Sequence, residues 1–215
     1  MDPIAIVSVV ASALVALAVL YRDIIRDWYF KPNLEITFSL EEPISRVTSV
    51  EWPLDTPYPS LHKSAFWLRL RIKNTGRSVA RRCEGILAEV RKPDGTLDKR
   101  YDPLTLRWAI APIKIGLEPI DIARDRQVHL NIFTTFENER FAAFATHPDP
   151  RGVPLSLGPG DYWIRIVIYG DNFNPVERGY AVHWDGKNYR EVDMKPMNDK
   201  PTSTTAWPWQ IEQGQ

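Results

Sequence analysis

The sequence opens with an apolar run that divides the chain into two unlike parts. Residues 4–21 read IAIVSVVASALVALAVLY without a charged side chain, and charge returns abruptly with Arg22 and Asp23. An apolar stretch of about 18 residues is near the lower length limit for a helix that crosses a bilayer. A cleaved signal peptide needs a basic leader and a small-residue cleavage site, which this segment lacks, and a buried core helix is the other alternative. The run predicts one uncleaved transmembrane helix.

The residues that flank the run predict its orientation and its contact with the membrane interface. Basic side chains follow the run and none precedes it, so the positive-inside rule places the following domain in the cytoplasm and the N-terminus outside. The helical spacing of apolar residues continues to Trp28, and Pro32 ends the helix. The side chains expected at the interface are Tyr21, Arg22, Arg26, Trp28, Tyr29 and Lys31. We therefore divide the chain into an anchor and juxtamembrane helix (1–31), a soluble domain (32–197) and a flexible C-terminal tail (198–215).

The composition of the chain limits the classes of function. The 27 basic and 27 acidic residues give a formal net charge of zero, whereas a general nucleic-acid binder would be strongly basic. The only cysteine, Cys83, has no partner for an intramolecular disulfide, which fits a reducing compartment. We expect no nucleic acid among the partners of this protein.

Apolar residues alternate with polar ones through most of the soluble part, which is the pattern of half-buried β-strands. The segment 162–169 is the clearest case, with Tyr162, Ile164, Ile166 and Ile168 predicted to face inward. The other predicted strands cover residues 34–40, 66–73, 80–91, 96–101, 104–108, 127–136, 141–146, 180–184 and 189–192. A short helix within 137–146 is the alternative for one of them. So many short strands predict an all-β antiparallel sandwich, with a closed barrel as the alternative.

Two of the turns carry a family resemblance. The stretch Leu70-Arg71-Ile72-Lys73-Asn74-Thr75-Gly76, followed by Ala80, resembles the "V-x-N-x-G-x-x-A" strand-turn-strand of bacterial immunoglobulin-like domains. The stretch Leu157-Gly158-Pro159-Gly160-Asp161-Tyr162 is similar to the "L-x-P-G-x-Y" start of a late strand in the same group, which includes cell-adhesion-related (CARDB-like) domains. The resemblance implies an immunoglobulin-like fold behind the membrane anchor. It implies no activity, because these motifs mark turns and core positions.

Residues with catalytic potential do not form a recognisable motif. The four histidines, His62, His129, His147 and His183, are not spaced as metal ligands, and no nucleophile elbow, Walker loop or dinucleotide fingerprint is present. We interpret His129 and His183 as hydrogen-bonded sheet residues and Cys83 as a buried structural cysteine. The sequence therefore predicts no enzyme, no cofactor and no metal site, and a hydrolase is the weakest hypothesis.

Two predicted strands repeat an aromatic-basic pattern on the side that faces away from the core. This pattern has two interpretations. The arginines stack on the tryptophans and only stabilise the sheet, or the surface binds a protein, an anionic headgroup or a nucleotide. The long connection 41–64 adds two aromatic residues, and it either hides an extra strand or forms a functional loop. The candidate partner-binding residues are Trp67, Arg69, Arg71, Trp163, Arg165, Tyr169, Trp52 and Tyr58.

The C-terminal segment Trp207-Pro208-Trp209 is expected either to pack on the surface of its own domain or to act as a docking peptide. Together these patterns predict a non-enzymatic, membrane-anchored interaction or sensing module that binds a protein partner at the cytoplasmic face. Small residues in the anchor (Ala11, Ser12, Ala13, Ala16 and Ala18) would allow self-association through the helix. The alternatives are an extracytoplasmic carbohydrate-binding or adhesion domain, with Trp67 and Trp163 stacked on sugar rings, and a ligand-triggered membrane effector.

Overall fold

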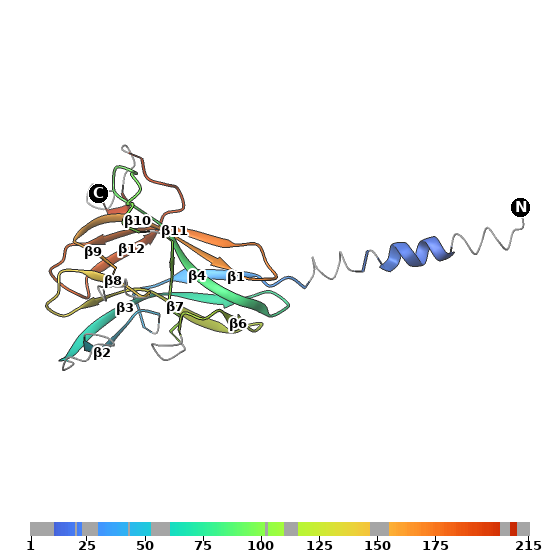
Figure 1. Cartoon of the computed structure of the whole chain (residues 1–215), viewed down its shortest axis with the longest axis horizontal. Coiled ribbons are helices and arrows are strands. Elements are labelled where there is room, and N and C mark those ends of the chain that lie inside the picture. Colours follow the sequence, from blue (N-terminus) through green and yellow to red (C-terminus); the bar gives the residue numbers. More distant parts are fainter. Residues whose placement is uncertain are drawn as a thin grey trace, which may run out of the picture.

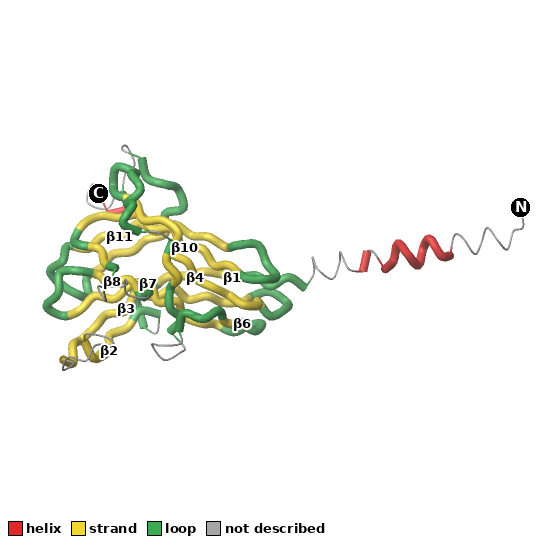
Figure 2. Tube along the Cα trace, in the orientation of Figure 1, coloured by secondary structure: helices red, strands yellow, loops and turns green. Residues whose placement is uncertain are grey.

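The described part of the chain forms two antiparallel β-sheets, as the alternation predicts (Figure 1). The computed structural model describes residues 11–19, 21–22, 30–42, 44–52, 61–101, 103–109, 116–146, 155–202 and 207–209, without the side chains of 49–52 and 61–63. Strands make up most of these residues outside the N-terminal helical segment (Figure 2). The expected all-β sandwich is confirmed at this level.

The first sheet is built around one long central strand. Its strand order is β1 (Leu34–Phe38), β3 (Leu61–Asn74), β7 (Gln127–Phe136), β8 (Ala142–Phe144) and β9 (Ser156–Leu157). A sixth strand, β2 (Arg46–Trp52), pairs with the first half of β3, while β1 pairs with its second half. The suspected extra strand in the long connection is therefore present as β2.

The second sheet contains the strand with the clearest alternation. Its order is β12 (Val192–Pro196), β11 (Val176–Trp184), β10 (Gly160–Tyr169), β4 (Ala80–Arg91) and β5 (Leu104–Thr105). A short strand, β6 (Ile120–Ile122), pairs with the beginning of β4.

The inner faces of the two sheets share one hydrophobic core. Side chains of β3 such as Leu68 and Leu70, and side chains of β10 such as Ile164 and Ile166, belong to the same buried cluster. Tyr162 packs against this cluster from its edge, so the inward set predicted for β10 is confirmed. Because the core lies between the sheets, their other faces point in opposite directions.

One segment joins the two sheets along an edge of the sandwich. β5 pairs with β4 in the second sheet, and three residues later Trp108 forms a bridge with Leu130 of β7 in the first sheet. Leu106 and Trp108 are buried in the core between these two pairings. By alternation, Arg107 faces outward beside Asn131, whose backbone N–H donates to the carbonyl of Arg107 at 2.9 Å.

Some predictions differ from the described chain. The predicted strand 189–192 overlaps β12 only at Val192, because residues 189–191 belong to the turn before it. Residues 96–101 form no strand: their pairing is limited to one bridge between Arg91 and Leu97, beside which the N–H of Asp98 donates to the carbonyl of Val90. The buried Asp98 carboxylate then accepts from the backbone N–H and the guanidinium of Arg100, which supports a turn. The alternative helix within 137–146 is also wrong, since 142–144 is strand β8. Leu40 lies beyond the end of β1 and is exposed.

The N-terminal segment is helical where it is described, at residues 11–19 and 21–22. All of these residues are exposed, and the large apolar ones include Leu14, Val15 and Val19. No helix within the described residues is long and apolar enough to cross a membrane. Much of the predicted anchor (1–10, 20 and 23–29) lies outside the described residues, so the span remains a prediction.

Candidate functional site

The two halves of the predicted aromatic-basic surface lie on opposite sides of the molecule. Trp67, Arg69 and Arg71 are on β3 of the first sheet, whereas Trp163 and Arg165 are on β10 of the second sheet. Tyr169 ends β10 on this second outer face and is exposed. The six residues therefore do not form one continuous surface, and each outer face must be considered separately.

The C-terminal tail covers the part of the second sheet's outer face that surrounds Trp163. Trp207 packs on Trp163 and Ala181, and the indole N–H of Trp163 donates to the carbonyl of Met197 at 2.8 Å. Trp163 is 1% exposed as a result, so the expectation of an exposed tryptophan is wrong at this position. Trp209 stacks on Trp207. The expectation that the Trp-Pro-Trp element packs on its own domain is confirmed.

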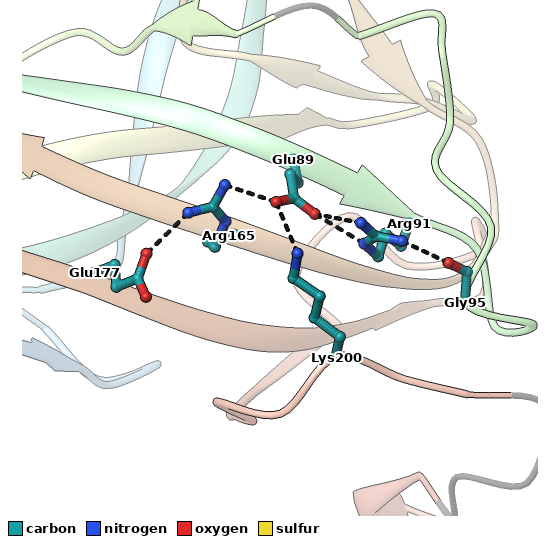
Figure 3. Close-up of polar contacts among 6 residues, drawn as sticks. All are labelled: Glu89, Arg91, Gly95, Arg165, Glu177 and Lys200. Atoms are coloured by element: carbon teal, nitrogen blue, oxygen red, sulfur yellow. Dashed lines mark hydrogen bonds and ion pairs between the residues drawn. The ribbon is translucent and has the colours of Figure 1, made fainter.

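The basic side chains in the network around Glu89 on this second face are paired with carboxylates (Figure 3). Arg165 donates to Glu89 at 2.6 Å and to Glu177 at 2.8 Å, and Glu89 also pairs with Arg91 at 2.7 Å and Lys200 at 3.1 Å. Burial would raise the pKa of Glu89, but hydrogen bonds from Arg91 and Lys200 and the charge of Arg165 outweigh it and hold the pKa below its ordinary value. Each arginine of this network has a carboxylate partner.

The outer face of the first sheet has a different arrangement, in which basic side chains meet neutral partners. Arg71 lies between Thr37 of β1 and His129 of β7, and its Nε donates to the Thr37 hydroxyl at 2.9 Å. Arg69 lies opposite Asn131 of β7, and its Nε donates to the Asn131 side-chain oxygen at 2.8 Å. Both guanidinium groups are thereby fixed by uncharged groups on the adjacent strands.

Trp67 supports this basic row and offers little surface of its own. Its indole N–H donates to Thr48 of β2 at 2.9 Å, and its side chain is 9% exposed. The Arg69 guanidinium lies 5.9 Å from the ring centroid, which is a cation–π distance. The predicted stacking of arginine on tryptophan therefore occurs on this face, whereas Arg165 on the other face is paired with carboxylates.

Positive charge is concentrated on the outer face of the first sheet, because its arginines meet neutral partners. Among the described residues, no carboxylate forms an ion pair with Arg46, Arg69 or Arg71. Burial, together with the charge of Arg46, lowers the pKa of Arg69 to about 10. Burial and the charges of Arg69 and Arg71 also lower the pKa of His129. A nearby anion would reverse these charge effects.

His129 is the member of this face that the sequence argument missed. It is a sheet residue, as expected, but its ring Nε2 is buried and has no hydrogen-bond partner, so the expected hydrogen bonding is not met at this nitrogen. No sequence pattern indicates this position, because His129 lies opposite Arg71 only through the pairing of β3 with β7. His183, by contrast, lies 2.6 Å from Asp161 and fits the original interpretation.

Some other predicted residues are only partly tested. The side chain of Trp52 and all of Tyr58, Arg26, Trp28 and Tyr29 lie outside the described residues. Tyr21, Arg22 and Lys31 are exposed. Cys83 is buried, and burial raises the pKa of its thiol to about 12, which agrees with a structural role.

Comparisons with known proteins supply no relative. No family model, no curated protein and no solved structure matches this chain. In the described part of the chain, no three His, Cys, Asp or Glu side chains gather in a way that could hold a metal ion.

The candidate site is the outer face of the first sheet. We call it the β3 face, and it consists of Arg46, Trp67, Arg69, Arg71, Arg107, His129 and Asn131.

Proposed function

We propose that this protein is a non-enzymatic interaction module, tethered to the membrane by its N-terminal helix, that binds a protein partner through the β3 face. The proposal includes an immunoglobulin-like sandwich on the cytoplasmic side of the membrane. The observation that carries it is the pair Arg69 and Arg71, held at their Nε atoms by neutral side chains and not matched by carboxylates within the described residues. Arginines on a rigid sheet are frequent anchors in protein interfaces.

The exposed apolar residues of the N-terminal segment support the tether. Leu14, Val15, Leu17 and Val19 are 50–64% exposed, and they belong to an uncharged run that extends from Ile4 to Tyr21. Contiguous exposed apolar side chains are costly in water and are stabilised when lipid surrounds them. Arg22, Arg26 and Lys31 follow the run and favour a cytoplasmic domain.

The carbohydrate-binding alternative loses its main support because the tryptophan rings are covered. Trp67 is 9% exposed and Trp163 is 1% exposed, whereas stacking on a sugar needs an open ring face. The β3 face offers charge in place of aromatic area, which favours an acidic partner.

The proposal is tested in cells with the full chain. C-terminal fusions to a fluorescent protein and to alkaline phosphatase should give fluorescence without phosphatase activity, in a membrane fraction that resists carbonate extraction. A photo-crosslinking residue at Gln127, which is exposed on the first sheet beside Lys73, should capture a discrete protein partner. The matched position on the second sheet is the exposed residue Asp193.

The crosslinking result decides the partner-binding part of the proposal. We expect a defined adduct from position 127, its loss when Arg69 and Arg71 are both replaced by glutamine, and no equivalent adduct from position 193. Equal labelling from both positions, or an adduct that survives the double replacement, would contradict the proposal. An active phosphatase fusion would contradict the cytoplasmic placement.

A further inference from the structure

The geometry of the β3 face points to a more specific binding chemistry: Arg69, Arg71 and His129 form a site for a phosphate group. This inference rests on the proposed function in one respect only, because it specifies what the binding face recognises. It requires neither the membrane tether nor a protein as the carrier of the phosphate.

The two arginines are positioned to act together. They are two residues apart on β3, so their Cα atoms are separated by about 7 Å on the same face of the sheet. Arg69 is held by Asn131 on one side and Arg71 by Thr37 on the other, and in both cases the Nε is the bonded atom. The terminal nitrogens of each guanidinium remain to donate to an oxyanion, and such forks pair with phosphate in a bidentate way.

The second sheet provides an internal comparison for the charge of this site. There, Arg165 occupies an equivalent outward position and is neutralised by Glu89 and Glu177. On the β3 face, the residues directly opposite Arg69 and Arg71 are the neutral Asn131 and Thr37, whereas the acidic Glu89 lies directly opposite Arg165. Glu35 of β1 lies opposite Lys73 and diagonal to Arg71, but within the described residues it forms no ion pair with Arg71.

His129 is the third donor of the site: a neutral imidazole has one N–H group, and protonation gives both ring nitrogens a proton. It lies opposite Arg71, and its buried Nε2 lacks a partner. The cationic residues around it are Arg69 and Arg71 on β3 and Arg107 on the segment that pairs with the other edge of β7. A doubly charged anion matches two guanidinium groups, and it would also stabilise the imidazolium form of His129. A carboxylate carries one charge and two oxygens, so it satisfies this set of donors less completely.

The test uses the full chain in phosphatidylcholine nanodiscs with histidine labelled for NMR. Inorganic phosphate is titrated at constant ionic strength, with acetate as the comparison anion. The His129 signals are identified by their loss in His129→Gln. The variants are Arg69→Gln with Arg71→Gln, the matched control Arg165→Gln on the other sheet, and Arg69→Lys with Arg71→Lys, which keeps the charge but removes the forks.

We expect phosphate to shift the His129 ring signals and to raise the pKa of His129 in the unsubstituted protein and in Arg165→Gln. The double glutamine variant should bind phosphate at least about tenfold more weakly, since it lacks both charged guanidinium forks. The lysine variant should be intermediate, and it keeps the test decisive if the glutamine variant does not fold. Equal phosphate affinity in all variants, or an equal response to acetate, overturns the inference.

A second arm identifies the source of the phosphate. Nanodiscs that contain phosphatidic acid in addition to phosphatidylcholine present the same group on a lipid. A His129 shift in these discs without added phosphate supports a lipid headgroup, and a shift only with inorganic phosphate supports a soluble ligand. The proposed function and the phosphate site can fail separately. If position 127 crosslinks a partner but phosphate does not bind, the interaction module is supported and the phosphate site is contradicted. If phosphate binds but positions 127 and 193 are labelled equally, the phosphate site is supported and the interaction module is contradicted.

Discussion

At the scale of single residues, His129 combines a buried ring nitrogen that has no partner with two cationic neighbours on β3. Its pKa is therefore lower in the folded chain than in the unfolded chain, where it is near 6.5. Below pH 6.5 the unfolded chain binds this proton more readily than the folded chain does. The stability associated with neutral His129 is thus present above pH 6.5 and is lost as the pH falls toward the lowered folded-state pKa.

This pH dependence of stability gives a prediction for the variant His129→Gln. Between pH 7.5 and 5.5, approximately, the free energy of unfolding should fall less steeply in the variant than in the unsubstituted protein, as measured by urea denaturation. His183→Gln is the control, because His183 lies on the other sheet beside Asp161. The same slope for His129→Gln and the unsubstituted protein would show that the half-buried His129 imidazole is not a source of acid sensitivity.

At the scale of elements, side-chain alternation predicted which face of a strand is buried, and it did so correctly for β10. The inward residues Ile164, Ile166 and Ile168 all lie in the core. Alternation did not predict which strands share a sheet, since strand order depends on pairings between distant residues, such as β3 with β7 and β10 with β4. For the same reason it placed Trp163 outward without revealing that Trp207 covers it.

The short strands were the least predictable elements. β6 and β9 have only three and two residues, too few to show a period, whereas β5 lies within the predicted strand 104–108. The turn at residues 74–76 was easier, because Asn74 and Gly76 are typical turn residues. Asn74 is buried, and its side chain bonds to the backbone of Ser78, Ile122 and Gly76, which fixes this turn to the beginning of β1 and to β6.

The docked tail yields a prediction at this scale. Trp207→Ala removes a large side chain that is 3% exposed and uncovers Trp163. We expect the free energy of unfolding to fall by about 2–4 kcal/mol and tryptophan fluorescence to become more accessible to iodide. Trp209→Ala is the matched control, because Trp209 is only partly buried and should cost less. Equal effects of the two substitutions, or none, would mean that the tail is not held by Trp207.

At the scale of the whole molecule, the sandwich core is built without the N-terminal apolar segment. The main buried cluster extends from Leu34 to Met194, and residues 11–19 are exposed. The boundary between the two parts is nevertheless attached to the sandwich. The carbonyl of Lys31 accepts from the N–H of Arg77, and the carbonyl of Asn33 accepts from the N–H of Thr75. Gly76 lies so close to this backbone that a Cβ there would be 2.2 Å from the nitrogen of Asn33.

These contacts predict different outcomes for two shortened chains. A chain that begins at Phe30 keeps the bonds from residues 31 and 33, so it should be monodisperse without detergent and should unfold cooperatively. A chain that begins at Leu34 loses these two hydrogen bonds to Thr75 and Arg77, so it should unfold at lower urea concentration. The full chain should require detergent or nanodiscs to stay dispersed, because the apolar side chains described in residues 11–19 are exposed. Light scattering and urea denaturation on the three chains measure this directly. A full chain that stays dispersed in plain buffer, or a chain from Phe30 that aggregates, would show that the apolar segment is covered by the protein itself and not by a membrane.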